Sequence, residues 1–316
     1  MIKLLRAGIR KYLHSFVFWL AIVATALVSF DAGMRAREYA VDDSCVLYLF
    51  LIIAIVISWI VGREAAEGGF RNKIIIGHTK GQIFLSELIL GSTFSLVVAV
   101  IFFGIFFTIN YYVFAYFPID IIVMMLLNCV LAGVCLTAML ATLCCLITNR
   151  IASAIVNMLL VFAMFLGTSE VEHALLQPEY FESYSSTLEQ WTDEEENVHS
   201  EMHKIEESIQ KTENPAYIAE PLRTVYKIVY RISPYGHISE HIVFTYDWFG
   251  YDYRDPITEQ SWENTAQQIA TNEISEEDYK NVATNILYCA VFSVAVYLIG
   301  YLVFRRKRKN YFFQYC

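Results

Sequence analysis

The chain has 316 residues, of which 56% are hydrophobic and only 17% are charged, and its formal net charge is −9. This balance excludes an ordinary soluble domain, which is less apolar and carries a charge on about a quarter of its residues. The acidic excess also speaks against a nucleic-acid partner, because nucleic-acid binding requires a basic surface.

The apolar residues form six long runs. A helix needs ~20 mostly apolar residues to cross the hydrocarbon core of a bilayer, which is ~30 Å thick. The runs that meet or approach this length are Tyr12–Phe30, Cys45–Gly62, Ile83–Ile109, Ile119–Thr148, Ile151–Gly167 and Asn285–Phe304. We therefore predict an all-α integral membrane protein with six transmembrane helices, five of them within residues 15–168 and the last at 283–304.

Residues 1–14 precede the first run and have the pattern of an amphipathic helix. Lys3 and Arg6 fall on one side at helical spacing, and Leu5 and Ile9 fall on another. Such a helix can lie on the inner membrane surface with its cations at anionic headgroups. The alternative is a basic flank that only orients the first span.

Basic residues near the ends of the spans lie mostly on one side of the membrane. Fourteen of the 23 basic residues lie in four segments: before span one, between spans two and three, between spans four and five, and after span six. The short loops of the opposite side hold only Arg35 and Arg37. Because such residues tend to remain cytoplasmic, we expect a multi-pass protein of the cell membrane with both termini, including the basic tail 305–316, in the cytoplasm.

The longest internal cytoplasmic loop, residues 62–82, reads GREAAEGGFRNKIIIGHTKGQ. Paired glycines at Gly68 and Gly69 favour a bend, and Gly77 is placed to end a helical stretch. Three consecutive isoleucines at 74–76 need to be covered, either by a partner or by the membrane face.

This loop resembles the loop between the second and third spans of type-2 ABC exporter permeases, particularly those related to bacitracin and lantibiotic resistance transporters. The residues that carry the resemblance are Glu64, Gly68, Arg71, Asn72, Lys73, Gly77, Thr79 and Lys80. The match continues through Ser86 and departs at Gly69 and Glu87. In that family the loop is a coupling helix that docks into a groove of the ATPase. The resemblance therefore implies that these eight residues couple the chain to an ATPase subunit.

Small residues recur four apart in spans three and four, and this spacing lets helices approach closely in lipid. The two series are Gly91, Ser95 and Ala99, and Gly133, Thr137, Ala141 and Cys145. We interpret them as packing within one chain rather than as a dimer seam.

Charged residues are almost absent from the spans, which argues against a proton-coupled transporter. Asn128 and Asn157 are the main strongly polar residues of spans four and five. Each is a candidate to line a pathway, and the favoured alternative is a structural hydrogen bond between helices.

Residues 169–282 form a large acidic domain that we expect to be extracellular, with 24 acidic and 7 basic residues and no cysteine. Thr192 and Glu195 have the spacing of a capping box, which predicts a helix from Asp193 to about Lys211. A second helix is expected from about Pro221 to Ile232, so the insertion is predicted to be mostly helical.

The segment after these helices contains Pro234 and Gly236, which resemble a Pro-x-Gly segment before the last span of the same permeases. An aromatic cluster that includes Trp248 and Tyr251 follows. These four residues are candidates for a substrate surface or outer gate, and the alternatives for the aromatics are an interfacial belt or the core of a small outer domain.

Two histidine pairs in this region, His199 with His203 and His237 with His241, have a spacing that can chelate a metal from one helix face. A third ligand of clear spacing is missing, so no metal site is predicted.

The chain lacks the phosphate-binding G-x-x-x-x-G-K-[ST] motif, and also H-E-x-x-H and G-x-S-x-G. We therefore expect no catalytic residue and no cofactor in this chain, with ATP and Mg²⁺ bound by a partner ATPase. The expected function is that of an exporter permease that moves an amphipathic substrate together with a second permease copy or a paralogue. The alternative is a membrane sensor or immunity protein that binds an antibiotic through its outer domain without transport.

Overall fold

The computed structural model describes residues 1–38, 44–111, 119–147, 149–183, 186–192, 198–204, 210–236, 238 and 276–306. The chain divides into two compact units, one made of Met1–Thr168 with Arg231–Cys316 and the other of Ser169–Tyr230.

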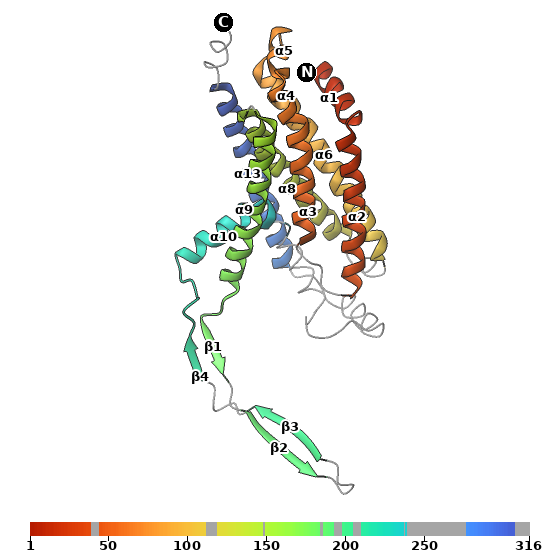
Figure 1. Cartoon of the computed structure of the whole chain (residues 1–316). Coiled ribbons are helices and arrows are strands. Elements are labelled where there is room, and N and C mark those ends of the chain that lie inside the picture. Colours follow the sequence, from red (N-terminus) through yellow and green to blue (C-terminus); the bar gives the residue numbers. More distant parts are fainter. Residues whose placement is uncertain are drawn as a thin grey trace. The chain divides into compact units, whose positions relative to one another are not determined.

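The first unit is a helical bundle (Figure 1). Its elements are α1 (Ile2–Leu13), α2 (Phe16–Glu38), α3 (Ser44–Ile57), the π-helical turn η1 (Ser58–Gly62), α4 (Arg63–Ala66), α5 (Gly69–Ile75), α6 (Lys80–Ile109), α8 (Ile119–Leu146), most of α9 (Arg150–Leu176) and α13 (Glu276–Arg306).

Six helices of the described residues are long and apolar enough to cross a membrane. They are Phe16–Arg35, Cys45–Ala66, Lys80–Ile109, Ile122–Leu146, Arg150–Leu176 and Ala283–Arg306. The chain is therefore a multi-pass membrane protein whose described spans are all helical, and the predicted number of spans is confirmed at this level.

The first span begins later than the apolar run that predicted it. The run starts at Tyr12, but Tyr12 belongs to α1, which ends at Leu13, and α2 begins at Phe16. The Tyr12 ring is buried and packs edge-on against Phe18 at 6.5 Å. The run thus covers parts of two helices, and the polar residues His14 and Ser15 lie between them.

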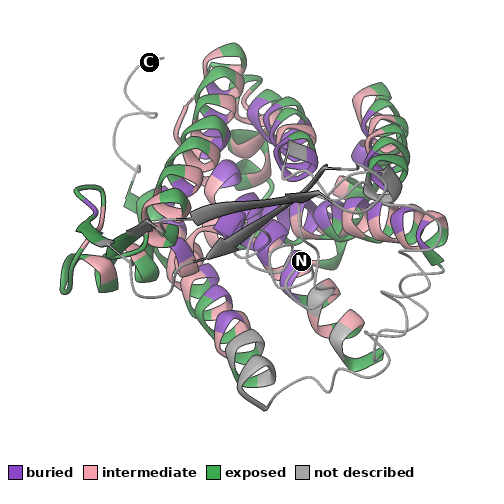
Figure 2. Ribbon diagram, turned by 90° about the horizontal axis from the view of Figure 1, so that it is seen from below, coloured by how far each residue is buried: buried purple, intermediate pink, exposed green. Residues whose placement is uncertain are grey.

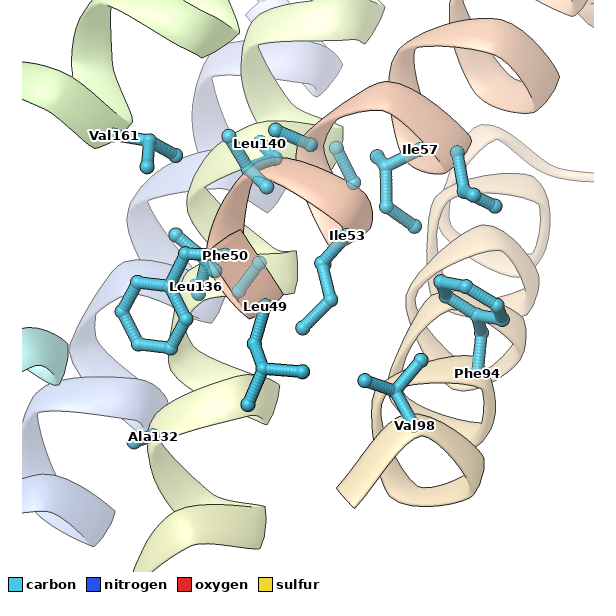
Figure 3. Packing of buried hydrophobic residues seen from close by; sticks show 14 of the residues in the cluster. Leu49, Phe50, Ile53, Ile57, Phe94, Val98, Ala132, Leu136, Leu140 and Val161 are labelled. Atoms are coloured by element: carbon cyan, nitrogen blue, oxygen red, sulfur yellow. The ribbon is translucent and has the colours of Figure 1, made fainter. Parts of the chain in front are cut away.

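The bundle core lies where α3, α6 and α8 meet, and α8 also contacts α13. Figure 3 shows aliphatic and aromatic side chains of these helices pointing toward one another, with Val161 of α9 beside them. Ala54, Val56 and Ile57 of α3 and Leu136 and Leu140 of α8 are completely buried. Such dense packing holds helices together where lipid removes the usual hydrophobic driving force.

The two series of small residues face each other between α6 and α8. The Ser95 hydroxyl lies 2.7 Å from the Thr137 hydroxyl and donates to the Gly133 carbonyl at 3.3 Å. A Cβ atom placed on Gly91 would lie 2.4 Å from Cγ2 of Thr137. The predicted packing within one chain is confirmed, and the glycines are needed because the backbones approach so closely.

The outward faces of the bundle are exposed, as Figure 2 shows by colour, and many of their residues are apolar. Leu27 of α2, Val100 of α6, Leu159 of α9 and Leu298 of α13 are each more than half exposed. A soluble protein rarely exposes so much contiguous apolar surface, whereas the acyl chains of a bilayer cover it without cost.

Three contacts place the basic segments at one end of the bundle. Lys11 of α1 reaches Glu64 of α4, the Arg150 guanidinium at the start of α9 lies 3.7 Å from the Trp59 ring centre, and Phe70 of α5 packs on Phe304 near the end of α13. The N-terminus and α5 are seen together at this end in Figure 1. The segments that the charge pattern assigned to one side therefore do lie on one side of the bundle.

In the second unit the described residues form four short strands, which differ from the predicted helix at Asp193–Lys211. Strand β1 (Tyr180–Ser183) pairs with β4 (Gln210–Glu213), and β2 (Ser186–Thr192) pairs with β3 (Val198–Lys204), both antiparallel. The helix prediction was wrong for the residues that form β3 and for the start of β4. Pairing with β2, which contains Thr187, Trp191 and Thr192, supplies the backbone hydrogen bonds of β3, and Thr and Trp favour strands.

The second predicted helix of the insertion is present as α10 (Leu222–Ile232). A bend at Ser233 separates it from a helical turn that begins at Pro234, a position where proline is favoured because its missing N–H would have no helical partner.

Candidate functional site: the α4–α5 loop and its charge network

Two glycines shape the loop between the second and third spans. Gly68 has φ of 75° and Gly77 has φ of 101°, both in the region that other residues adopt only at a cost. Gly68 separates α4 from α5, and Gly77 follows the end of α5. The predicted bend and helix end are therefore both present.

The third span begins with a capping box. The Thr79 hydroxyl accepts a hydrogen bond from the Gln82 backbone N–H at 3.2 Å, and the Gln82 side chain accepts one from the Thr79 N–H at the same distance. Two orphan donors of the helix start are satisfied in this way. Thr79, which the resemblance assigned to ATPase coupling, thus also fixes where the loop ends and the span begins.

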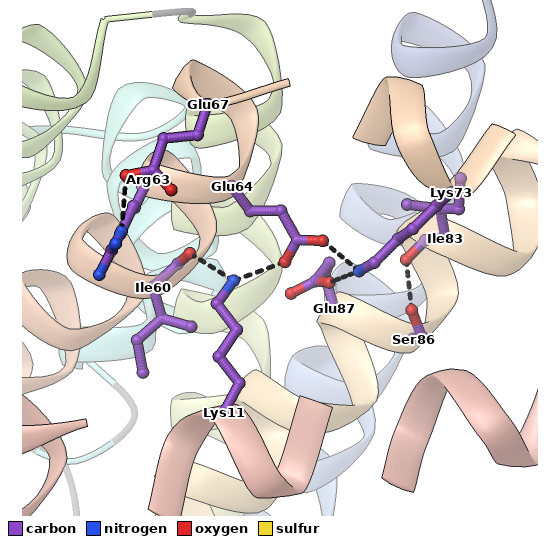
Figure 4. A network of polar contacts seen from close by, with 9 residues as sticks. All are labelled: Lys11, Ile60, Arg63, Glu64, Glu67, Lys73, Ile83, Ser86 and Glu87. Carbon is purple, nitrogen blue, oxygen red and sulfur yellow. Dashed lines mark hydrogen bonds and ion pairs between the residues drawn. The ribbon is translucent and has the colours of Figure 1, made fainter. Parts of the chain in front are cut away.

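The inner face of the loop carries a network of four charged residues, shown in Figure 4. Lys11 of α1 donates to Oε2 of Glu64 at 2.6 Å and to the Ile60 carbonyl at 3.1 Å. Lys73 of α5 pairs with Oε1 of Glu64 and, at 2.8 Å, with Oε1 of Glu87 in α6. Two lysines thus alternate with two glutamates, and the formal charges of the four residues cancel.

This network joins elements that are distant in the sequence. Glu64 and Lys73 were predicted as contacts of a partner ATPase, but their charged groups face inward and bind each other. Lys11 and Glu87 were not predicted as site residues. Glu87 is only 2% exposed, and an acid inside an apolar helix is expected to have a charged partner. The position of Glu87 within an apolar run was therefore the feature of the sequence that could have indicated the network.

The carboxylates of this network stabilise the charged form of the lysine between them. Burial would lower the pKa of Lys73, but the carboxylates of Glu87 and Glu64 outweigh it and raise that pKa above its ordinary value. Burial, with the Glu87 carboxylate second, also raises the pKa of the Tyr12 hydroxyl, which therefore stays neutral beside the network. Lys73 remains a cation through the whole physiological range.

The π-helical turn η1 links the network to the core. It exposes the Ile60 carbonyl to Lys11, and Ser58 at its start accepts a hydrogen bond from the Asn157 amide of α9 at 2.7 Å. The same amide lies 3.1 Å from the Cys144 sulfur of α8. Asn157 therefore makes the interhelical bond that was the favoured alternative to a pathway role.

Aromatic packing fixes α5 to the last span. The Phe70 and Phe304 ring centres lie 5.8 Å apart, and Phe84 of α6 stacks on Phe304 at 5.5 Å. The Lys73 ammonium also lies 5.8 Å from the Phe70 ring centre. One side of α5 is thus held by both charge and ring contacts to α4, α6 and α13.

The outer face of the loop is exposed and apolar at its end. Ile75 and Ile76 are 71% and 77% exposed, the highest values in the loop's apolar run. Of the residues assigned to ATPase coupling, Arg71, Asn72, Gly77 and Thr79 are also exposed. The loop therefore has an inner face bound to its own bundle and an outer face available to a partner.

Three other predicted residues lie in other elements. Asn128 is fully buried in α8. Pro234 and Gly236 are buried in the turn after α10, while Trp248 and Tyr251 fall outside the described residues. The described candidates, Asn128, Pro234 and Gly236, thus belong to other elements than the loop.

The histidine pairs form no metal site in the described part of the chain. His199 and His203 lie in strand β3 rather than on a helix face, and His237 and His241 are outside the described residues. No group of three or more His, Cys, Asp or Glu side chains in the described ranges is placed to hold a metal ion.

Comparisons of the chain with protein families, with curated proteins and with solved structures find no match. The function is therefore inferred from the residues and from the geometry of the α4–α5 loop.

Proposed function

We propose that this chain is the membrane-spanning subunit of an ATP-driven ABC exporter whose ATP and Mg²⁺ are bound by a separate ATPase subunit. The proposal places the α4–α5 loop, both termini and the start of α9 in the cytoplasm. A second permease copy or a paralogue completes the assembly. The substrate class is an amphipathic compound such as an antimicrobial peptide.

The observation that carries the proposal is the contrast between the two faces of α5 and its end. Lys73 and Phe70 bind the helix to three other elements, whereas Ile75 and Ile76 project without cover among the described residues. Exposed consecutive isoleucines are costly in water and mark a protein or membrane contact. A segment that couples a partner to the spans needs both an exposed surface for the partner and a firm attachment to the bundle. Without that attachment, the segment would move without moving the spans.

The charge network supplies the route from such a segment to the spans. Lys73 pairs with Glu64, and α4 runs without a break into η1 and α3. It also pairs with Glu87 in α6. A displacement of α5 is therefore passed to the second and third spans together. ATP binding by the partner would then bias the bundle between states through its different affinity for each of them.

Substitution of the exposed isoleucines tests this proposal. Ile75→Asp and Ile76→Asp, together with Arg71→Glu, are expected to leave the chain inserted and monodisperse while the ATPase subunit no longer co-purifies. ATP hydrolysis of the preparation should fall with it. The matched control is Ile151→Asp, because Ile151 is 70% exposed at the same end of the bundle but lies outside the loop.

A photo-crosslinking amino acid at position 75 identifies what covers the loop. The proposal requires a crosslink to a nucleotide-hydrolysing subunit in native membranes. Crosslinks to lipid alone, or a full ATPase complement in the Ile75→Asp variant, would refute it.

The charge of the outer segment supports the substrate class. Residues 169–282 carry a net charge of −17, and opposite charge raises the local concentration of a cationic substrate. Replacing the acidic run 193–196 with Asn and Gln should reduce stimulation of ATP hydrolysis by a cationic amphipathic peptide. Stimulation by a neutral analogue of the same peptide should be unchanged.

A further inference from the structure

Helix α10 has two sharply different faces. Its sequence LRTVYKIVYRI places Leu222, Val225, Val229 and Ile232 at the spacing of one helical stripe. The basic residues recur every fourth position on the opposite face, at 223, 227 and 231. This separation is typical of a helix that lies in the surface of a membrane.

The charge of α10 is opposite to that of the segment around it. Residues 169–282 contain 7 basic residues against 24 acidic ones. Three of the 7 fall within the eleven residues of α10, which contain no acid. Arg223 donates to the Leu175 carbonyl at 2.6 Å and lies over the Tyr217 ring, so Lys227 and Arg231 form the outward part of the cationic face.

The apolar face of α10 is not covered by the described residues. Leu222, Val225, Ile228 and Val229 are all about half exposed. An isolated helix of this length is marginal in water and needs its apolar face to be buried. Something outside the described part of the chain must therefore cover it.

The end of α10 is tied to the bundle at a defined depth. The Ser233 hydroxyl lies 2.9 Å from the hydroxyl of Thr168 in α9. Thr168 lies 18 residues after Arg150, the first residue of α9, which corresponds to ~27 Å along a helix. This distance nearly equals the ~30 Å hydrocarbon thickness. Since Arg150 lies at the α5 end of the bundle, Ser233 lies near the opposite membrane surface.

Tyr235 keeps the chain at that depth. Its side chain is 1% exposed, and its ring lies 5.1 Å from that of Phe165 in α9 and 6.3 Å from that of Phe50 in α3. Only two residues lie between Tyr235 and the last residue of α10. Arg231 and Ile232, the two residues of α10 that belong to the same unit as the bundle, therefore lie near the boundary between acyl chains and headgroups.

We propose that α10 lies in a membrane surface, with its apolar face among acyl chains and Lys227 and Arg231 at anionic phospholipid headgroups. A lipid surface meets both faces of the helix at once, which an apolar protein groove does not. The inference depends on the six spans and not on the proposed transport function.

Depth-dependent quenching tests this placement on the full chain. The six cysteines of the described residues are buried, so single exposed cysteines can be labelled in a Cys316→Ser background. A fluorophore at Val229→Cys should be quenched by brominated acyl chains as strongly as one at Leu298→Cys, a lipid-facing position of the last span. Thr224→Cys, outside the apolar stripe, should keep most of its emission.

The headgroup assignment is tested with nanodiscs of phosphatidylcholine alone and of phosphatidylcholine with equimolar phosphatidylglycerol. Anionic lipid should increase quenching at position 229, and Lys227→Glu with Arg231→Glu should remove that increase. Equal quenching at positions 224 and 229, or none at 229, would overturn the placement. A crosslink between two copies from position 229 would also overturn it, because the face would then be a subunit contact. Equal quenching at position 229 in nanodiscs with and without the anionic lipid would overturn the role of the two cations.

Discussion

Glu87 shows how a carboxylate is retained inside an apolar helix. It is almost completely buried, and Lys73 reaches it from a different element. Taking charges out of water is costly, and it is compensated only when each charge keeps a partner. The neighbouring Glu64 and Lys11 extend the same compensation toward the surface, so the four side chains act as one unit.

Removing Lys73 should therefore be far more harmful than removing a surface cation. Lys73→Met leaves Glu87 buried without its cation, and we expect a loss of about 3–5 kcal/mol in the free energy of unfolding. Arg63→Ala breaks the exposed pair with Glu67 and should cost only about 0.5 kcal/mol. Thermal unfolding in detergent measures both. The double variant Lys73→Met, Glu87→Met should recover much of the loss, and equal effects of the two single variants would contradict the network.

The raised pKa of Lys73 gives this stabilisation a pH dependence. A free lysine titrates at about pH 10.4, and the folded pKa lies above that because of Glu87 and Glu64. The contribution is thus fully present below about pH 10.4 and is lost as the pH rises through the folded pKa. The thermal midpoint should fall more steeply above this pH in the wild type than in Lys73→Met, and parallel curves would exclude the effect.

The residues of this site illustrate what a loop sequence can predict. The resemblance selected Glu64, Arg71 and Lys73 as one functional set, and the structure does place them in one loop. The resemblance did not indicate which of these side chains face the bundle and which face outward. That choice depends on the left-handed turn at Gly68, which sets how α5 rotates relative to α4, and on Lys11, which arrives from a segment 53 residues away.

At the scale of whole helices, two glycines of α6 should respond in opposite ways to the same substitution. Gly91→Ala brings a methyl group against Thr137 and Ile57 and should cost about 1–3 kcal/mol through overpacking. A Cβ atom at Gly104 has no neighbour within 4 Å. Gly104→Ala should therefore stabilise the helix by about 0.5–1 kcal/mol.

The comparison of these two variants by thermal unfolding separates helix propensity from packing. Stabilisation by both alanines would mean that α6 and α8 are not in close contact at Gly91.

Apolar runs predicted the helices of the bundle well, because a run long enough to cross a bilayer has few other uses. They were less informative where structure depends on contacts. Tyr12 was counted in the first apolar run but lies in a different helix, because the chain breaks at the polar residues His14 and Ser15, and its ring packs back on Phe18. The segment that forms strand β3 was predicted as a helix from one capping pattern, although pairing with β2 decided its structure.

At the scale of the whole molecule, the charge pattern makes a prediction about sidedness. Cysteines introduced at Ile76 and Ala216, both at exposed positions, should react differently with a membrane-impermeant maleimide. We expect Ala216→Cys to be labelled on intact cells and Ile76→Cys only after permeabilisation. This is the outcome that basic residues on the cytoplasmic side require.

Labelling of Ile76→Cys from outside would reverse the topology and remove the loop from the reach of a cytoplasmic ATPase. The convergence of α1, α5, α9 and α13 at one end of the bundle would remain, because it depends on side-chain contacts and not on which side of the membrane they face.

The π-helical turn at Ser58–Gly62 lies in the second span and determines in which direction around the helix axis the side chains after it point. A π turn accommodates one residue more than the α-helical ladder does, and one residue corresponds to about 100° of rotation around a helix axis. If that wide turn tightened into regular α-helix, the carboxylate of Glu64 would swing away from both lysines while the core below stayed in place. A one-residue change of winding inside the bilayer would thus be enough to disengage the α5 end of the protein from its spans.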